Sequence, residues 1–257
     1  MGRFALLEKV NTKETLSENE KKEYEIVKNR INTICQKAHN LSVPVFIDAE
    51  ESWIQDTIDE IATTMMRQYN KERAIVYNTL QMYRWDRLSY LKKCYVDAEK
   101  HQYFLGIKLV RGAYMEKERA RAEKLEYASP IQKSKASTDK DYDLAVSFCV
   151  DHIDQIYFCA GTHNEDSSTK LTQLLEEKGI DSDNKRVYFS QLLGMSDHIS
   201  YNLAYANYNV AKYVPYGPVK QVMPYLIRRA EENTSIAGQT GRELALIIKE
   251  KARRSAE

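Results

Sequence analysis

The fold of this chain is indicated by residues 104–114, which read FLGIKLVRGAY. The first seven residues form an apolar run of strand length that only Gly106 and Lys108 interrupt. The run then ends in a cation, a glycine and an aromatic residue. Such an ending is typical of parallel sheets, whose chemistry lies at the carboxyl ends of the strands.

The same alternation of strand and helix extends along the chain on both sides of this stretch. Short apolar runs predict six strands, at residues 43–47, 74–77, 104–110, 156–160, 186–189 and 210–214. Helical spacing of apolar residues predicts helices around 17–38, 54–65, 88–95, 171–175, 194–205 and 219–230. A capping box of Ser17 and Glu20 opens the first of these helices. Strands that alternate with helices indicate parallel crossovers, in a doubly wound sheet or a barrel.

The polar residues at the predicted strand ends favour the barrel. They are Asp48, Glu50, Asn78, Lys108, Arg111, residues 162–164, residues 190–191 and Tyr213. The ends of many different strands converge on one mouth only if the sheet closes on itself. We therefore expect an α/β fold of the (β/α)8 TIM-type, with residues 125–141 as a surface loop.

The strand count falls short of this barrel, because six strands are predicted where a closed barrel has eight. We expect residues 1–257 to form one barrel domain that is incomplete at its N-terminus and supplies the third to eighth strands.

Composition excludes several classes of partner. The 257 residues carry a formal net charge of +1, so no overall field favours nucleic acid. The four cysteines are far apart in the sequence and predict reduced core thiols. No apolar run reaches the roughly 18 residues that a membrane span needs, and no apolar signal run opens the chain, so we expect a cytoplasmic protein.

Each candidate cluster has a structural alternative. The cations of Lys108 and Arg111 beside Gly112 suit an anion or an electron-rich ring, but could equally reach solvent at a strand end. His163 follows a strand, yet a single histidine is more often structural than catalytic. Asp48 and Glu50 share a strand face, as in a metal site, but this interpretation has weak support.

The predicted helix near the C-terminus carries a polar stripe of Tyr225, Arg228, Arg229 and Glu232. A solvated face is the usual explanation for such a stripe. Two arginines beside a tyrosine can also hold a planar carboxylate through bidentate, charge-assisted hydrogen bonds.

At these positions the sequence resembles the proline dehydrogenase (proline oxidase) family, over residues 3–245. The motifs that carry the resemblance are KLVRGAY at 108–114 with Glu118, THN at 162–164, QLLGM at 191–195, KYVPYG at 212–217 and YLIRRAEEN at 225–233. Their order and spacing match as well. The resemblance implies the barrel, an FAD cofactor and oxidation of L-proline.

The resemblance also implies roles for individual residues. Arg228 and Arg229 match the pair that binds the substrate carboxylate, and Leu192, Tyr213 and Tyr225 match positions that wall the substrate ring. Tyr213 favours proline over hydroxyproline. Asp48 and Lys108 match the polar pair nearest the reactive edge of the flavin. The FAD-binding positions correspond to Ala49, Asn78, Arg111, Gly112, Ala113, Thr162 and His163.

Two departures from the family pattern stand out. Many members have arginine where this chain has Lys108, and a lysine keeps the charge but loses the planar fork. The family's strand with a substrate-binding lysine has no counterpart before residues 2–4. We therefore expect a second polypeptide to supply two strands and that lysine.

The favoured hypothesis is FAD-dependent oxidation of L-proline to 1-pyrroline-5-carboxylate, the first step of proline catabolism, with electrons passed to a quinone. An alternative is a non-catalytic flavin-binding subunit that needs a complementing chain. A metal-dependent hydrolase using Asp48, Glu50 and His163 is a third, weaker hypothesis. The protein could also lie peripherally at the inner membrane, which in a eukaryote would be mitochondrial.

Overall fold

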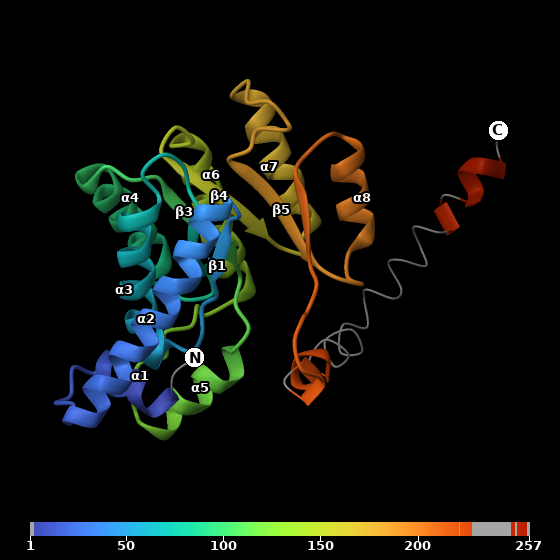
Figure 1. Ribbon diagram of the computed structural model, residues 1–257. Helices are drawn as coiled ribbons and strands as arrows, with labels where there is room; N and C mark the ends of the chain where they lie inside the picture. The colour runs from blue at the N-terminus through green and yellow to red at the C-terminus, as the bar shows by residue number, and fades with distance from the viewer. Residues whose placement is uncertain (1–2, 221, 228–247, 250, 256–257) are drawn as a thin grey trace. The chain divides into compact units, whose positions relative to one another are not determined.

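The computed structural model describes residues 3–220, 222–227, 248–249 and 251–255 (Figure 1). The chain divides into two compact units, Met1–Lys212 and Tyr213–Glu257. We describe each unit by itself.

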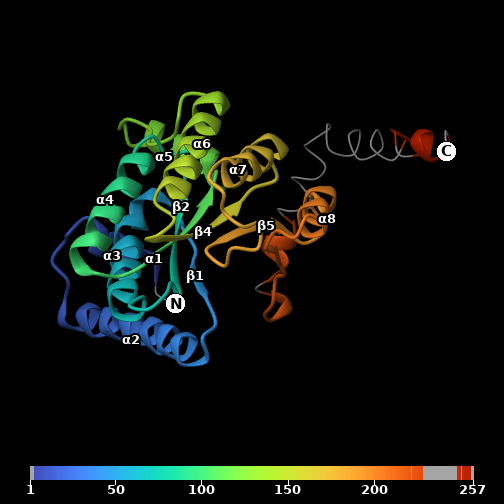
Figure 2. The same ribbon diagram turned by 90° about the horizontal axis from the view of Figure 1, so that it is seen from above.

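The first unit is built on a sheet of six strands that are neighbours in the order in which they follow one another along the chain, and the last strand ends at Tyr213, the first residue of the second unit. The strands are β1 (Val45–Ile47), β2 (Val76–Gln81), β3 (Leu105–Val110), β4 (Ile156–Gly161), β5 (Val187–Leu192) and β6 (Val210–Tyr213). Neighbouring strands run parallel and the sheet curls into part of a barrel (Figure 2). All six predicted strands, and the barrel-type fold, are confirmed.

One strand begins and ends later in the sequence than predicted. Residues 74–77 were expected, whereas β2 spans Val76–Gln81. Asn78 therefore lies inside the strand, and Gln81 stands at its carboxyl end. The apolar run marks where the strand begins, but the polar residues that follow it are fully buried and continue the strand.

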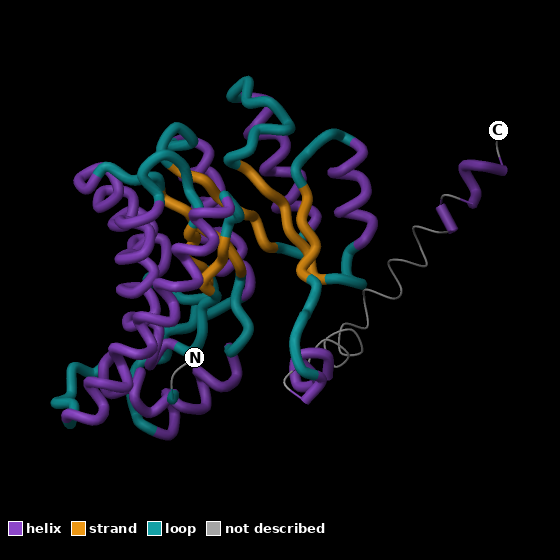
Figure 3. The backbone as a smooth tube through the Cα atoms, viewed as in Figure 1, coloured by secondary structure: helices purple, strands orange, loops and turns teal. Residues whose placement is uncertain are grey.

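Helices connect the strands (Figure 3). They are α1 (Phe4–Asn11), α2 (Glu18–Leu41), α3 (Ser52–Tyr69), α4 (Arg87–His101), α5 (Met115–Lys124), α6 (Lys135–Asp151), α7 (Glu165–Glu177) and α8 (Asp197–Tyr205). The capping box of α2 is confirmed, since the Glu20 backbone N–H donates to Ser17 Oγ at 3.3 Å and Ser17 N–H donates to Glu20 Oε2 at 2.9 Å.

The expected surface loop over residues 125–141 is wrong in its second part, because α6 begins at Lys135. Ser134 caps this helix by accepting a hydrogen bond from the Ser137 N–H at 3.1 Å. The first turn of α6 reads KAST at residues 135–138, a composition that resembles a loop. Its burial begins only at Thr138 and Tyr142.

The core lies between one face of the sheet and the helices. Alternate residues of each strand, such as Val76, Ile107, Phe158 and Val187, are buried in a single hydrophobic cluster. Helices α3, α4, α6 and α8 pack against the strands. The residues between them point to the opposite face of the sheet, which we call the inner face. Many of these residues are polar or aromatic.

The inner face carries a row of side chains that the strand register aligns. Thr79 of β2 pairs with Lys108 of β3, Lys108 with Cys159 of β4, and Cys159 with Tyr188 of β5. Lys108 is thus the charged member of a row that crosses four strands. The row corresponds to the interior of a barrel.

In the second unit, residues 219–220 and 222–227 are helical, which confirms the described part of the helix expected over 219–230.

Candidate active site

The site begins with an ion pair on the inner face. Asp48 directly follows β1, and its Oδ1 lies 2.5 Å from the Nζ of Lys108 in β3. The Lys108 side chain is only 17% exposed, and its ammonium lies 5.4 Å from the centre of the Phe46 ring. Thr79 donates a long hydrogen bond of 3.4 Å to the same Asp48 oxygen. The two residues predicted as a polar pair are therefore in contact.

The loop that follows Asp48 is bound to the next two strands. Gln81 at the end of β2 donates to the Glu50 carbonyl at 2.7 Å, and its Oε1 accepts from the Ala113 N–H at 3.3 Å. The Glu50 carboxylate accepts from the Tyr114 hydroxyl at 2.5 Å. Burial raises the pKa of Glu50, although the Tyr114 hydroxyl opposes this change.

Arg111 lies at the carboxyl end of β3 and makes three polar contacts. Its Nε donates to Asp139 at 2.6 Å, one terminal nitrogen to Thr162 Oγ1 at 2.7 Å and the other to Ser167 Oγ at 3.0 Å. The guanidinium also stacks over the Tyr142 ring at 4.4 Å. This arrangement brings Arg111 and Thr162 into contact and joins β3 and β4 to α6 and α7.

The turn after Arg111 requires glycine. Gly112 has a φ of +137°, a conformation that residues with a Cβ rarely adopt. A Cβ there would also come within 2.5 Å of the Tyr83 ring. The turn thus presents the Ala113 N–H to Gln81, beside the loop that carries Ala49.

The end of β4 is joined to the loop after β5. His163 Nδ1 lies 3.0 Å from Ser196 Oγ, and Gln191 donates to the Thr162 carbonyl at 3.2 Å. Thr162 Oγ1 accepts from the Asn164 N–H at 3.0 Å, and Asn164 in turn caps α7. Leu192 ends β5 and is half-buried.

Asn78 does not lie with these residues. Its side chain points to the helix side of β2 and donates to Asp59 of α3 at 2.8 Å. The residue is completely buried. The reason is the alternation of the strand, since Thr79 faces the inner side and its neighbour must face the helices. Its assignment as an FAD-binding residue remains a prediction.

In the second unit, the rings of Tyr213 and Tyr225 are in contact, with centroids 5.4 Å apart and planes at 54°. Tyr213 is 43% exposed. The predicted carboxylate-binding residues Arg228 and Arg229 lie outside the described residues, and so does Glu232.

Comparison with known proteins assigns the chain to a family. A family model of proline dehydrogenase matches residues 4–242. The chain belongs to the proline dehydrogenase family. It is 38% identical to proline dehydrogenase 1, mitochondrial, of Drosophila melanogaster, an alignment that covers 91% of this chain and 36% of that protein.

Other relatives of the proline dehydrogenase family show similar agreement. The human proline dehydrogenase 1, mitochondrial, is 38% identical over 88% of this chain and 38% of its own length. The carbapenem antibiotics biosynthesis protein CarD of Pectobacterium carotovorum is 32% identical over 99% of this chain and 65% of that protein. The chain thus spans about a third to two thirds of the length of these relatives.

Solved structures agree on the fold. Proline utilization A from Bdellovibrio bacteriovorus, inactivated by N-propargylglycine, matches with a TM-score of 0.77 at 24% identity, over 84% of this chain and 22% of that one. A variant of the Bradyrhizobium japonicum protein of the same name matches with a TM-score of 0.74 at 22% identity, over 83% of this chain and 22% of that one.

The side chains at this site include the cationic and hydrogen-bonding groups that an anionic dinucleotide needs. Lys108 in β3 and Arg111 just after it supply two cations, and Thr162 and His163 add a hydroxyl and an imidazole; Arg111 also donates to Asp139, Thr162 and Ser167. Phosphate and carbonyl oxygens of FAD require donors of this kind. The donor chemistry therefore agrees with the cofactor that the family implies.

The family resemblance named several of these positions, whose roles remain predictions, but it did not name the residues that contact them. Gln81, Asp139, Ser167 and Ser196 were not predicted as part of the site. If the end of β2 had been predicted correctly, Gln81 would have been recognised as a polar residue at the end of a strand. The other three lie on helices or loops distant in sequence, where no local pattern marks them.

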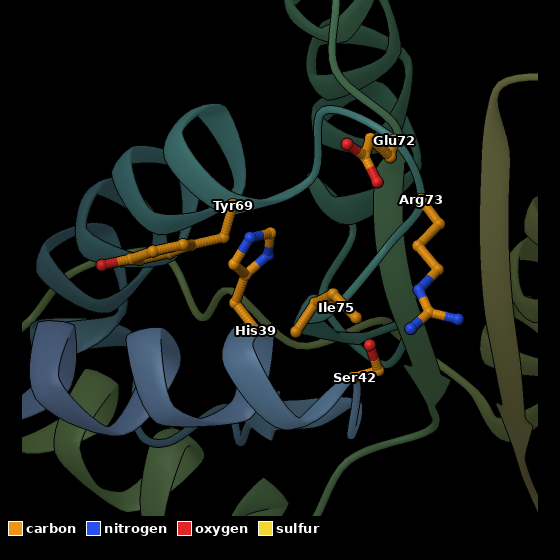
Figure 4. A pocket seen from close by; sticks show the side chains of 6 residues that line it. All are labelled: His39, Ser42, Tyr69, Glu72, Arg73 and Ile75. Carbon is orange, nitrogen blue, oxygen red and sulfur yellow. The ribbon is translucent and has the colours of Figure 1, made fainter.

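A separate pocket of about 160 Å³ lies at the opposite ends of the strands (Figure 4). It is lined by His39, Ser42, Tyr69, Glu72, Arg73 and Ile75. Ile75 immediately precedes β2, whereas the candidate site follows the strands. The pocket contains none of the residues predicted for substrate or cofactor.

The described residues contain no group of three or more His, Cys, Asp or Glu side chains arranged to hold a metal ion. The hydrolase hypothesis built on Asp48, Glu50 and His163 gains no support from their arrangement, since Asp48 pairs with Lys108 and His163 contacts Ser196. Among the helices that the structure describes, none is long and apolar enough to cross a membrane.

Proposed function

We propose that this chain oxidises L-proline to 1-pyrroline-5-carboxylate with FAD as its cofactor, the first step of proline catabolism. The observation that carries the proposal is the contact between Asp48 and Lys108 on the inner face of the barrel-type sheet. The chain in which this contact is found belongs to the proline dehydrogenase family. In this reaction proline loses a hydride from the ring carbon beside nitrogen and a proton from nitrogen. FAD, when bound, supplies the two-electron acceptor.

The residues have distinct tasks in this proposal. Lys108 would stabilise the negative charge that a bound cofactor gains during reduction, and Asp48 holds its ammonium in position. Arg111, Gly112, Ala113, Thr162 and His163 would hold the cofactor, together with Ala49. The half-buried position of Lys108 strengthens its field, because little water screens it.

The substrate residues come from the family assignment. Arg228 and Arg229 would bind the carboxylate of proline through paired, charge-assisted hydrogen bonds. Leu192, Tyr213 and Tyr225 would enclose the ring, and the contact between the two tyrosine rings supports a shared role for them.

Electrons would pass from the reduced cofactor to a quinone, as in the favoured hypothesis above. The relatives of fly and human are named mitochondrial, which supports a mitochondrial location if the source is eukaryotic. A peripheral contact with the inner membrane, or a cytoplasmic location in a bacterium, is part of the same proposal.

We also infer that further strands complete the sheet, supplied by a second polypeptide. The support is the edge of β1, which pairs with β2 on one side and has no strand neighbour on the other among the described residues. Phe46 in this edge strand is 42% exposed. An unpaired parallel strand edge with an exposed aromatic side chain is a favourable site for another strand.

One absorption spectrum tests the function. Purified protein should show a flavin spectrum that proline bleaches under anaerobic conditions. A flavin spectrum that proline leaves unchanged would favour the alternative, a non-catalytic flavin-binding subunit. Protein that binds no flavin, either alone or with its complementing chain, would contradict both functions.

A variant tests the substrate site. Arg229→Ala should raise the KM for proline by about 10- to 100-fold, since a charge-assisted contact with a carboxylate contributes about 1.5–3 kcal/mol. Lys220→Ala removes an exposed cation nearby in the sequence and is the matched control. Unchanged proline kinetics in Arg229→Ala would refute the assignment of the carboxylate site.

Size-exclusion chromatography with mass analysis tests the second polypeptide. We expect the active, flavin-loaded species to contain this chain together with another. An active species that contains this chain alone would contradict the proposal.

A further inference from the structure

The loop that carries Asp48 is attached to a pair of buried polar side chains inside α3. Gln55 accepts a hydrogen bond from the Glu50 backbone N–H at 2.8 Å, and its Nε2 donates to Asp59 Oδ1 at 2.9 Å. The two residues are 2% and 3% exposed. An ionised carboxylate only accepts hydrogen bonds, so the amide of Gln55 must turn its nitrogen to Asp59 and its oxygen to the loop.

Asp59 is itself held from three elements. Besides Gln55 in its own helix, Asn78 of β2 donates to the same oxygen at 2.8 Å, and Arg87 of α4 donates to Oδ2 at 2.8 Å. Asp86 contacts the other guanidinium nitrogens of Arg87. A buried carboxylate with three donors from a helix, a strand and a second helix has little freedom to move.

The loop is held from its other side as well. The Glu50 carbonyl accepts from Gln81, so both polar groups of this residue's backbone are bound to buried amides. Asp48 is two residues away and accepts the contact from Lys108 at 2.5 Å. A shift of the Glu50 backbone would therefore carry the Asp48 carboxylate away from the ammonium.

We propose that Gln55 and Asp59 are positioning residues for the Asp48–Lys108 pair, acting through the Glu50 backbone N–H. Both side chains are buried on α3 and bonded to protein groups, so they act on the pair through the loop. The effect on proline oxidation rests on the proposed function, whereas the effect on the loop does not. Because a misplacement of about 1 Å can cost about 100-fold in rate, a small movement of the loop is enough to be measured.

The first variant is Gln55→Met, with Asn70→Leu as its matched control. Methionine has a similar length to glutamine but no donor or acceptor for the loop. Asn70 is also a fully buried amide, and it caps the other end of α3. Its side chain donates to the carbonyls of Val76 at 2.8 Å and Phe104 at 3.0 Å and accepts from the N–H groups of Ile75 and Val76, both at 2.9 Å, at the opposite ends of the strands.

Hydrogen exchange in the flavin-free protein gives a readout independent of catalysis. In Gln55→Met, we expect the Glu50 amide to exchange about tenfold faster, which corresponds to the loss of one hydrogen bond. In Asn70→Leu, the faster exchange should appear at Ile75 and Val76 instead. An unchanged Glu50 amide in Gln55→Met would overturn the proposal.

Flavin reduction at saturating proline gives the second readout. We expect about a tenfold slower reduction in Gln55→Met and less than about a twofold change in Asn70→Leu. FAD affinity should change by less than about threefold in both. Equal rate losses in the two variants would show a purely structural role and refute the proposal. If the unmodified protein is not reduced by proline, the proposed function fails, while the exchange experiment still decides the positioning.

Exchanging the amide of Gln55 and the carboxylate of Asp59 provides a further test, which does not depend on Gln55→Met folding correctly. Gln55→Glu places two carboxylates in contact, which should accelerate Glu50 exchange and slow reduction. The double variant Gln55→Glu with Asp59→Asn restores a donor opposite an acceptor at position 55, although the new amide nitrogen also faces the Asn78 donor, so it should recover only part of both losses. A double variant no better than Gln55→Glu would overturn the proposal.

Discussion

Glu118 is a buried carboxylate whose removal should measurably weaken the attachment of α3. It is completely buried in α5, and its two oxygens accept from the Ser52 N–H and the Ser52 hydroxyl, each at 2.6 Å. Ser52 is the first residue of α3, and Glu51 at the N-cap makes no side-chain capping bond. Glu118 therefore caps this helix from 66 residues away in the sequence.

The size of the effect follows from these contacts. Glu118→Gln can keep both hydrogen bonds, with its oxygen toward the backbone N–H and its nitrogen toward the rotatable hydroxyl, but it loses the charge. Hydrogen bonds to charged groups contribute about 1.5–3 kcal/mol, against about 0.5–1.5 kcal/mol for neutral ones. The favourable interaction with the helix dipole adds up to about 1 kcal/mol. We expect Glu118→Gln to lower the free energy of unfolding by about 2 kcal/mol.

Glu118→Ala should cost more, about 4 kcal/mol, because it leaves the two Ser52 donors without an acceptor and opens a cavity. Urea denaturation followed by circular dichroism measures both values. Glu116→Gln is the control, since Glu116 is an exposed acid in the first turn of the same helix and should change stability by less than about 0.5 kcal/mol. A Glu118→Gln variant as stable as the unmodified protein would refute the capping role.

Three further predictions concern stability. Burial alone would raise the pKa of Asp86, but hydrogen bonds from two arginines outweigh it and lower the pKa to about 2. This stabilisation, about 2 kcal/mol, is present above pH 4 and is lost as the pH falls through about 2. The stability difference between the unmodified protein and Asp86→Asn, followed by urea titration, should therefore shrink over that range, and a constant difference would contradict the pairing. Gly106→Ala would place a Cβ 2.3 Å from the Val76 carbonyl oxygen, so we expect a loss of about 3 kcal/mol or more and a clearly lower Tm; an unchanged Tm would show that the strands move apart easily. Ser17→Ala removes the capping box of α2 and should cost about 1 kcal/mol in urea denaturation, whereas a loss below about 0.3 kcal/mol would mean that tertiary packing alone holds the helix end.

Much of the fold could be predicted from the sequence alone. All six strands, and the helices around 17–38, 54–65 and 88–95, followed from apolar periodicity, because a strand or an amphipathic helix is specified by residues close together in the chain. The beginning of α6 was not predicted, because its first turn is polar and resembles a loop. The Asp48–Lys108 pair was anticipated from the family resemblance, not from periodicity.

Tertiary structure alone determined which polar side chains meet. Asn78 and Gln81 lie in one strand, yet one points to Asp59 and the other to Glu50, because alternation and strand register set their faces. Asp59 gained its partners Asn78 and Arg87 only when β2 and α4 packed against α3. Such contacts join residues from different elements, and their geometry depends on how those elements pack. Local sequence therefore specified the elements, while packing decided the partners of each buried polar group.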